Sequence, residues 1–177
     1  MKSEIIIRLA QLSDIESMMA VELSASQIFE SLPIEIRNQL SKTIPPHDLA
    51  FYQKQVAAKT SWVLCYRDEV VGFICTSIIC KQKILHIEEL DVALPFQGKG
   101  LGKKLIDFVI QFALLHSIER LTLTTFKNVP WNAPFYLKCG FKQLNDKNLD
   151  ERLTNILKDE DRLGLHHNTR CAMEMRL

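Results

Sequence analysis

Hydrophobic positions along the chain change their period several times, and the changes mark the expected elements. Short apolar runs at residues 4–10, 61–80 and 84–94 predict strands. The run at 61–80 is interrupted by the polar residues 67–69, which predicts a hairpin. The polar residues 81–83 are then expected to turn the chain into the third run. Strands that follow one another so directly predict an antiparallel meander.

Helical periodicity is clearest between residues 101 and 115. A capping box of Ser13 and Glu16 predicts a first helix that continues to residue 29. Two prolines open a second expected helix at 45–59. An amphipathic helix is expected at 149–164, with these leucine and isoleucine side chains directed inward: Leu149, Leu153, Ile156, Leu157 and Leu163.

The other C-terminal segments alternate between strand and helix patterns. Residues 119–126 and 169–177 predict strands, and residues 130–141 predict a short helix that ends at Gly140 and leads into a strand at 141–144. The full order is β-α-α-β-β-β-α-β-α-β-α-β. It predicts one α/β domain over residues 1–177, with a mixed α+β sheet rather than a doubly wound parallel one.

Composition and charge exclude several classes of function. The chain has 177 residues and a formal net charge of +1, so we expect neither nucleic acid nor a membrane as partner. The N-terminal apolar run is too short for a leader or a membrane span. Five cysteines without CxxC spacing predict reduced thiols in a cytoplasmic protein, and the histidines show no metal-ligand spacing. A homodimer is left open.

A glycine-rich loop, "QGKGLG" at residues 97–102, stands between an apolar strand and an apolar helix. Its spacing fits neither the P-loop nor the GxGxxG dinucleotide motif. Three close glycines let several N–H groups approach one point, and the helix N-terminus adds its unpaired donors. This arrangement suits a pyrophosphate. The alternative is a turn that only joins the strand to the helix.

The loop, together with "LDV" before it and "PFYLKCGF" after it, resembles the motifs of the GNAT superfamily of N-acetyltransferases. The similarity extends over nearly the whole chain, and it implies a GNAT-like fold with a meander, a central splayed strand and flanking helices. It also implies acetyl-coenzyme A as the acyl donor, without a metal. The loop would then bind the pyrophosphate, and the strand before it would pair with the pantetheine arm.

The resemblance implies a set of cofactor-binding residues. The spacing in "NVPWNAPFY" is one residue longer than usual, so the asparagine that contacts the cofactor is either of the two in this segment. The set comprises Leu90, Asp91, Val92, Gln97, Gly98, Lys99, Gly100, Leu101, Gly102, Lys103, Asn128, Asn132 and Phe135.

Transfer of an acetyl group to an amine requires removal of a proton from the amine and protonation of the leaving sulfur. By strand alternation, Glu88 should share a face with Leu90 and Val92, and Glu89 with Asp91. Relatives with a similar acidic pair imply Glu88 as the base, and Glu89 would bind a cationic acceptor. The alternative is that both are solvated charges at a strand edge.

Tyr136 matches the family tyrosine whose hydroxyl protonates the departing thiolate, with a core aromatic as the alternative. The acceptor is expected to be an amine of a small molecule or of a protein, bound near the first two helices and the "TIPPHD" connection at residues 43–48. Two other functions compete with transfer. One is a non-catalytic acyl-CoA-binding regulatory module, and the other is a nucleotide-binding regulator.

Overall fold

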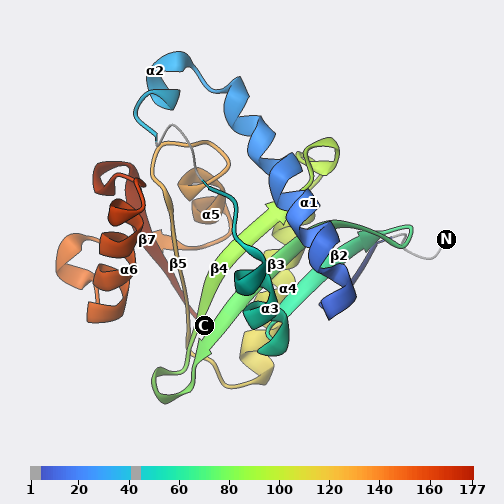
Figure 1. Ribbon diagram of the computed structural model, residues 1–177. Coiled ribbons are helices and arrows are strands. Elements are labelled where there is room, and N and C mark those ends of the chain that lie inside the picture. Colours follow the sequence, from blue (N-terminus) through green and yellow to red (C-terminus); the bar gives the residue numbers. More distant parts are fainter. Residues whose placement is uncertain (1–4, 41–44) are drawn as a thin grey trace.

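Seven strands form one mixed sheet in the order β1-β2-β3-β4-β5-β7-β6. The computed structural model describes residues 5–40 and 45–177 (Figure 1). The strands are β1 Ile5–Leu9, β2 Ser61–Tyr66, β3 Glu69–Ile79, β4 Ile84–Val92, β5 Arg120–Phe126, β6 Lys142–Gln143 and β7 Arg170–Arg176. The α-helices are α1 Ile15–Ser26, α2 Ile34–Arg37, α3 Leu49–Ala57, α4 Leu101–Leu115, α5 Ala133–Lys138 and α6 Glu151–Arg162.

The predicted meander is confirmed in strands β2, β3 and β4, which pair antiparallel in sequence order. Arg67 and Asp68 both have positive φ, at 49° and 68°, as the two-residue turn between β2 and β3 requires. The next turn ends at Lys83, whose φ is 51°. The mixed α/β sheet and the order of elements also agree with the prediction, and the short helix α2 is an addition to it.

Helices cover both faces of the sheet, and each face has its own core. Figure 1 shows α1 and α3 in front of the sheet and α4 behind it. Behind the sheet, α4 and α5 pack on a core whose fully buried members include Leu105, Ile106 and Leu121. In front, α1 and α3 pack on Val63, Phe73 and other side chains. These two layers hold β4 between them, and β4 is the strand that carries the expected active-site acids.

The predicted capping box of Ser13 and Glu16 is wrong. A 3₁₀ turn at Leu12–Asp14 precedes α1, and the Asp14 carboxylate accepts the Gln11 N–H at 2.8 Å. Arg8, at the end of β1, donates to both oxygens of Asp14, at 2.7 and 2.8 Å. The Asp14 carboxylate accepts hydrogen bonds from Arg8 of β1 and from the Gln11 N–H at the same time. Asp14 is therefore the acidic residue that caps the start of this segment.

Three further boundaries differ from expectation. Helix α1 ends at Ser26 and continues as a 3₁₀ helix at Gln27–Ser31. Helix α6 ends at Arg162, so Leu163 is 70% exposed, while Leu153 is fully buried as expected. Strand β6 has only two residues. No helix in the described ranges is both long and apolar enough to cross a membrane.

Candidate active site

Strands β4 and β5 are parallel, but they pair only at their beginnings. The paired positions are Ile84 with Arg120, Leu85 with Leu121 and His86 with Thr122. Beyond His86 the two strands separate, while β4 continues to Val92 beside β3. The second half of β4 therefore has one open edge, as the resemblance implied for the splayed strand.

Backbone groups of Leu90 and Val92 point to this open edge. The Ala93 N–H donates to the Val71 carbonyl across the β3–β4 ladder, at 2.9 Å. Hydrogen-bonded pairs alternate with non-hydrogen-bonded pairs in an antiparallel ladder, so Leu90 and Val92 occupy non-hydrogen-bonded positions toward β3. Their N–H and C=O groups are directed toward the side that β5 has left. An extended ligand with amide groups could pair there as an additional strand.

The glycine loop ends at the N-terminus of α4, beside the end of β4. Gly98 and Gly100 have φ of +71° and +77°, a region that residues with a Cβ rarely adopt, and Gly100 is the N-cap of α4. Neither glycine has another group within 4 Å of the place where a Cβ would stand. The unpaired N–H groups of the first turn of α4 thus border open space, which is the requirement for a phosphate cradle.

Because Gly102 has no side chain, Phe135 and Leu90 can pack closely against the backbone of α4 beside the glycine loop. A Cβ at Gly102 would lie 3.4 Å from the Phe135 ring and 3.6 Å from Leu90. Phe135 belongs to α5, so this contact brings α4, α5 and the open edge of β4 together. Lys99 and Lys103 already have partners in the structure: the carbonyl of Pro95 at 2.9 Å and the carboxylate of Asp107 at 2.6 Å, respectively.

Glu88 is the extra residue of a β-bulge. The register passes from Cys75 opposite Glu89 to Thr76 opposite Ile87, which leaves Glu88 without a partner on β3. Simple alternation therefore fails at this point. Leu85 and Ile87 pack in the core behind the sheet before the bulge, and Leu90 and Val92 pack there after it.

The predicted common face of Glu88 with Leu90 and Val92 is accordingly wrong, because the bulge shifts the alternation by one residue. The exposed Glu88 carboxylate lies within electrostatic range of His47 and Arg152 instead. The placement of Glu89 and Asp91 on one face agrees with the raised pKa of Asp91, which has burial and then the Glu89 charge as its causes. Their neighbours opposite on β3, Cys75 and Phe73, belong to the front core.

Several polar side chains meet in front of β4. His47 Nε2 lies 3.0 Å from a Glu89 carboxylate oxygen, and the His47 backbone N–H donates to the Glu22 carboxylate at 3.0 Å. The Tyr52 hydroxyl donates to Glu22 at 2.6 Å. Single ligand atoms of Glu22, His47 and Glu89 all lie within 4.8 Å of one another. This group, with Asp91 beside it, is called the acidic cluster below.

Burial and neighbouring charges shift the protonation of the acidic cluster. Burial raises the pKa of Glu22, although hydrogen bonds from Tyr52 and His47 oppose the shift. Burial favours the neutral ring of His47, but the Glu89 hydrogen bond and the surrounding carboxylates outweigh it and raise the pKa of His47. Burial and the charges of Glu89 and Glu22 raise the pKa of Asp91 well above its ordinary value.

Tyr136 is a buried side chain of α5, and its ring meets those of Phe135 and Phe141 edge-on. Burial, and then the charges of Glu89 and Asp91, raise the pKa of its hydroxyl. The hydroxyl therefore keeps its proton, and no hydrogen bond is recorded for it within the described residues. A protonated, unengaged phenol near the two acids is able to donate to a leaving thiolate.

The two asparagines after β5 differ in position. Asn128 is exposed, whereas Asn132 is the N-cap of α5 and is partly buried. The Asn132 carbonyl accepts the N–H groups of Phe135 and Tyr136, at 2.8 and 3.1 Å. Neither side chain makes a capping hydrogen bond to α5. Which of the two asparagines contacts the cofactor therefore stays a prediction.

Sequence reasoning did not single out His47, Tyr52 or the group at the fork between β4 and β5. At the fork, His86 Nδ1 lies 2.9 Å from the Thr122 hydroxyl and 3.2 Å from the Arg152 guanidinium. Burial and the Arg152 charge lower the pKa of His86 to about 3, so its ring is neutral. His47 stands in the "TIPPHD" connection expected near the acceptor, of which Thr43 and Ile44 lie outside the described residues.

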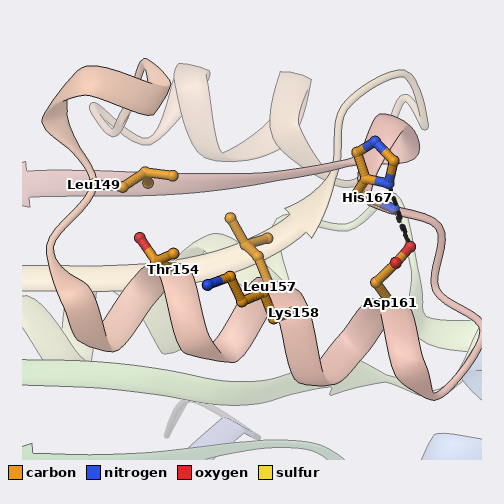
Figure 2. Close-up of a pocket in the computed structure, with 6 residues that line it drawn as sticks. All are labelled: Leu149, Thr154, Leu157, Lys158, Asp161 and His167. Carbon is orange, nitrogen blue, oxygen red and sulfur yellow. Dashed lines mark hydrogen bonds and ion pairs between the residues drawn. The ribbon is translucent and has the colours of Figure 1, made fainter.

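A pocket beside α6 lies apart from these groups. Figure 2 shows its lining residues, with His167 and Asp161 facing each other as an ion pair at 3.4 Å. None of the lining residues belongs to the open edge of β4, the glycine loop or the acidic cluster: Leu149, Thr154, Leu157, Lys158, Asp161 and His167.

Solved structures of similar fold include N-acetyltransferases and an N-acetylglutamate synthase. The chain superimposes on the PaiA N-acetyltransferase of Thermoplasma acidophilum in complex with coenzyme A, with a TM-score of 0.70, 16% identity and 98% and 99% of the two chains covered. The N-acetylglutamate synthase of Neisseria gonorrhoeae, complexed with coenzyme A and N-acetyl-glutamate, gives 0.69 at 16% identity. That match covers 100% of this chain and 36% of the other. At these identities the likeness shows the fold.

Sequence comparison supplies the family. The N-acetylaspartate synthetase of Danio rerio is 24% identical over 99 residues, which are 56% of this chain and 35% of that protein. This chain thus spans about a third of the length of that relative. The family model described as the acetyltransferase (GNAT) family matches residues 27–141. That match covers His47, Glu89 and Asp91 of the acidic cluster, the open edge of β4, the glycine loop and Tyr136, and the chain belongs to the GNAT family of acetyltransferases.

Proposed function

We propose that this protein transfers the acetyl group of acetyl-coenzyme A directly to the amine of a small molecule or of a protein. The observation that carries the proposal is the open edge of β4 beside the glycine loop. Leu90 directs its backbone N–H and C=O groups to that edge, Val92 directs its N–H there, and the loop follows at its end. A binding site for a long thioester that has both amides and a pyrophosphate needs these two features together.

Residues of the chain fit acetyl-coenzyme A. The space above Gly98 and Gly100 admits phosphate, and the N–H groups at the start of α4 supply donors and the positive end of the helix dipole. Acetyl-coenzyme A would bring the activated acyl group as a thioester. The N–H of Val92 is the donor that would polarise the thioester carbonyl. The carbonyl of Val92 itself is already bonded to Gln97, so the N–H is the backbone group of Val92 that remains for the ligand.

Two side chains would handle protons. Glu88 projects from the bulge into solvent where the two strands separate, and it would accept the proton of the amine, directly or through water. Tyr136 would donate its proton to the departing sulfur. A phenol whose pKa is raised by burial stays protonated at neutral pH, so its O–H is present as a donor when a thiolate forms beside it. Glu89 would contribute to binding of the acceptor.

The names of similar proteins do not define the acceptor. They refer to N-acetylglutamate, N-acetylaspartate and, for Arabidopsis thaliana Naa50, a bisubstrate analogue that joins coenzyme A to a peptide. The shared element is an amine that receives an acetyl group. The reaction class follows from the family and the site, whereas the acceptor depends on residues particular to this chain.

Two measurements test the proposal. Calorimetric titration should show micromolar or tighter binding of acetyl-coenzyme A and no comparable binding of adenosine triphosphate. Screening of an amine library by release of free thiol from acetyl-coenzyme A should then find an acceptor. Tight binding without turnover of any amine would indicate an acyl-CoA-binding module. A preference for adenosine triphosphate would refute both readings.

A further inference from the structure

Carboxyl groups outnumber cationic side chains at the acidic cluster. Glu22 comes from α1, and Glu89 and Asp91 come from β4, so three carboxyl groups meet in one partly buried region. Among the described residues, His47 is the cation that acts on them, through its contact with Glu89 and its charge near Glu22. One imidazolium falls short of the two negative charges that Glu22 and Glu89 carry when both are ionised, and Asp91 adds a third carboxyl group.

Asp91 differs from the other two carboxyl groups of the cluster, because it lacks a recorded partner among the described residues. No hydrogen bond or ion pair to its carboxyl group is recorded within the described residues. Its pKa is raised by burial and by repulsion from Glu89 and Glu22, with no cation among the causes. A cation that enters between carboxyl groups whose pKa is raised by burial and mutual repulsion favours their ionised forms and is bound by them in return. The cluster also remains open to solvent, because the side chains of His47 and Glu89 are 36% and 30% exposed.

The chemistry of acetyl transfer limits which cation can fill this role. An amine must be neutral when it attacks the thioester, so the reacting nitrogen cannot supply the missing positive charge. The balancing charge must come from a second group of the acceptor that keeps its proton throughout. Glu88, the proposed base, is the bulge residue immediately before Glu89. Adjacent residues of β4 would therefore contact the two ends of such an acceptor: Glu88 the reacting amine and Glu89 the charged group.

We propose that the acceptor is a diamine, one amino group of which is acetylated while the other, protonated, is bound by Glu22, Glu89 and Asp91. This inference rests on the N-acetyltransferase function proposed above. In the transfer, the neutral nitrogen forms a bond to the acetyl carbon and the carbon–sulfur bond breaks. The amine proton passes to Glu88 or water, and the sulfur receives the Tyr136 proton. The second ammonium takes no part in bond changes.

Aromatic side chains shape the same region without neutralising it. The His47 ring is stacked on the Phe51 ring, with centroids 3.7 Å apart and planes at 12°. Tyr52 is oriented edge-on to both, and its hydroxyl is held by Glu22. These contacts fix His47 and Glu22 in place before a ligand arrives. A fixed acidic site bounded by apolar rings favours an ammonium on an alkyl chain over an amino acid with its own carboxylate, which Glu22 and Glu89 would repel.

The first test compares three acceptors in the thiol-release assay: 1,4-diaminobutane, butylamine and glutamate. The diamine should show the highest kcat/KM, about 10- to 100-fold above butylamine, the range expected for one charge-assisted hydrogen-bonded contact. Glutamate should be the poorest. Equal rates for diaminobutane and butylamine, or a preference for glutamate, would overturn the inference while leaving the transferase function intact.

The second test uses variants. Glu22→Gln should raise KM for diaminobutane about tenfold or more and leave butylamine unchanged. Glutamine still accepts the Tyr52 hydrogen bond, so the local structure should persist. Glu16→Gln, an exposed change on the same helix, is the matched control and should alter neither. Equal effects of Glu22→Gln on both amines would indicate a structural role and contradict the inference.

Binding gives a readout that does not depend on turnover. Calorimetry of diaminobutane with the coenzyme A-loaded protein should show binding that Glu22→Gln weakens and Glu16→Gln does not. Failure of turnover with all amines, with this binding retained, would refute the transferase function and the diamine's role as acceptor, and would leave only the ammonium-binding site. A titration with Zn²⁺ addresses the other cation that Glu22, His47 and Glu89 could hold. Tight Zn²⁺ binding that excludes the diamine would overturn the inference.

Discussion

The side-chain amide of Gln97 donates a hydrogen bond to the carbonyl oxygen of Val92, at 2.8 Å. Gln97 is the first residue of the glycine loop, and Val92 is the last residue of the strand with the open edge. The bond therefore fixes the distance between the two halves of the proposed cofactor site. The other polar atom of Gln97, Oε1, is buried without a hydrogen-bond partner among the described residues, so the donated bond is the one that holds this side chain.

Gln97→Leu should weaken acetyl-coenzyme A binding by about tenfold, because the lost hydrogen bond, worth about 1–1.5 kcal/mol, positions both binding segments. Calorimetric titration gives the affinity, and thermal unfolding gives the stability. Gln53→Leu, an exposed glutamine on α3, is the control for the change of side chain. A fall in melting temperature with unaltered affinity would show that Gln97 acts on the fold and not on the site.

Gly100→Val should abolish measurable binding of acetyl-coenzyme A in a folded protein. The new side chain would occupy the open space at the N-cap of α4, and the φ of +77° would add about 1–2 kcal/mol of backbone strain. Gly164→Val, with a φ of +91° after α6, imposes the same strain far from the loop. It should lower stability to a similar extent and leave affinity unchanged. Normal affinity in folded Gly100→Val would contradict the phosphate cradle.

Local signals explain why much of the fold could be predicted from the sequence. The period of α4 and the polar turn at Arg67 and Asp68 each fix an element by nearby residues alone. The capping of α1 could not be predicted in this way, because Asp14 is selected by Arg8 from the preceding strand. The residues around Ser13 and Glu16 carry no information about that tertiary partner.

Tyr136→Phe should lower kcat about 10²-fold and leave acetyl-coenzyme A affinity nearly unchanged. The hydroxyl is needed only when negative charge develops on sulfur, so its loss raises the transition state and not the bound state. Packing against Phe135 and Phe141 should survive, since the ring is kept. Pre-steady-state measurement of the chemical step is the check. Full turnover with chemistry rate-limiting would return Tyr136 to a packing role.

Asp14→Asn should destabilise the protein by about 2 kcal/mol at pH 7, since it removes a two-point bond from Arg8. The Arg8 hydrogen bond lowers the pKa of Asp14 below its ordinary value. The stabilisation is therefore complete above the unfolded-state pKa near 4 and is lost as the pH falls through the lowered folded-state value.

Denaturant unfolding of both proteins at several pH values tests this sign. The wild-type advantage should be largest near pH 7 and shrink below about pH 4. Asp159→Asn breaks an exposed pair with Arg162 and should cost at most about 0.5 kcal/mol. An advantage that persists undiminished at pH 2 would mean that packing, and not the charge of Asp14, stabilises this segment.

The candidate site was predictable to different depths in its different parts. The loop glycines were visible because backbone at positive φ leaves a direct mark on the sequence. The bulge at Glu88 leaves none, since one additional residue in a strand looks like any other. His47 and Glu22 are 25 residues apart and meet only because α1 and the connection before α3 pack together. Only the tertiary structure reveals that meeting.

Glu88→Gln should reduce kcat/KM for an amine acceptor by about tenfold or more near pH 7, if Glu88 is the base. Glutamine keeps the size and hydrogen bonding but cannot accept the proton. At pH 9–10 a growing fraction of the amine, with a pKa near 10, has lost its own proton, so the deficit should narrow. Glu69→Gln, an exposed change on β3, is the control and should be silent.

Glu89→Gln should behave differently from Glu88→Gln, because Glu89 is engaged by His47 and would bind the charged part of the acceptor. Its main effect should be a higher KM for a cationic acceptor, with kcat largely retained. The reverse pattern, a pH-dependent loss of rate in Glu89→Gln and a KM effect in Glu88→Gln, would exchange the two roles. A deficit independent of pH in both variants would show that neither carboxylate is the base, and a bound water would then have to remove the proton.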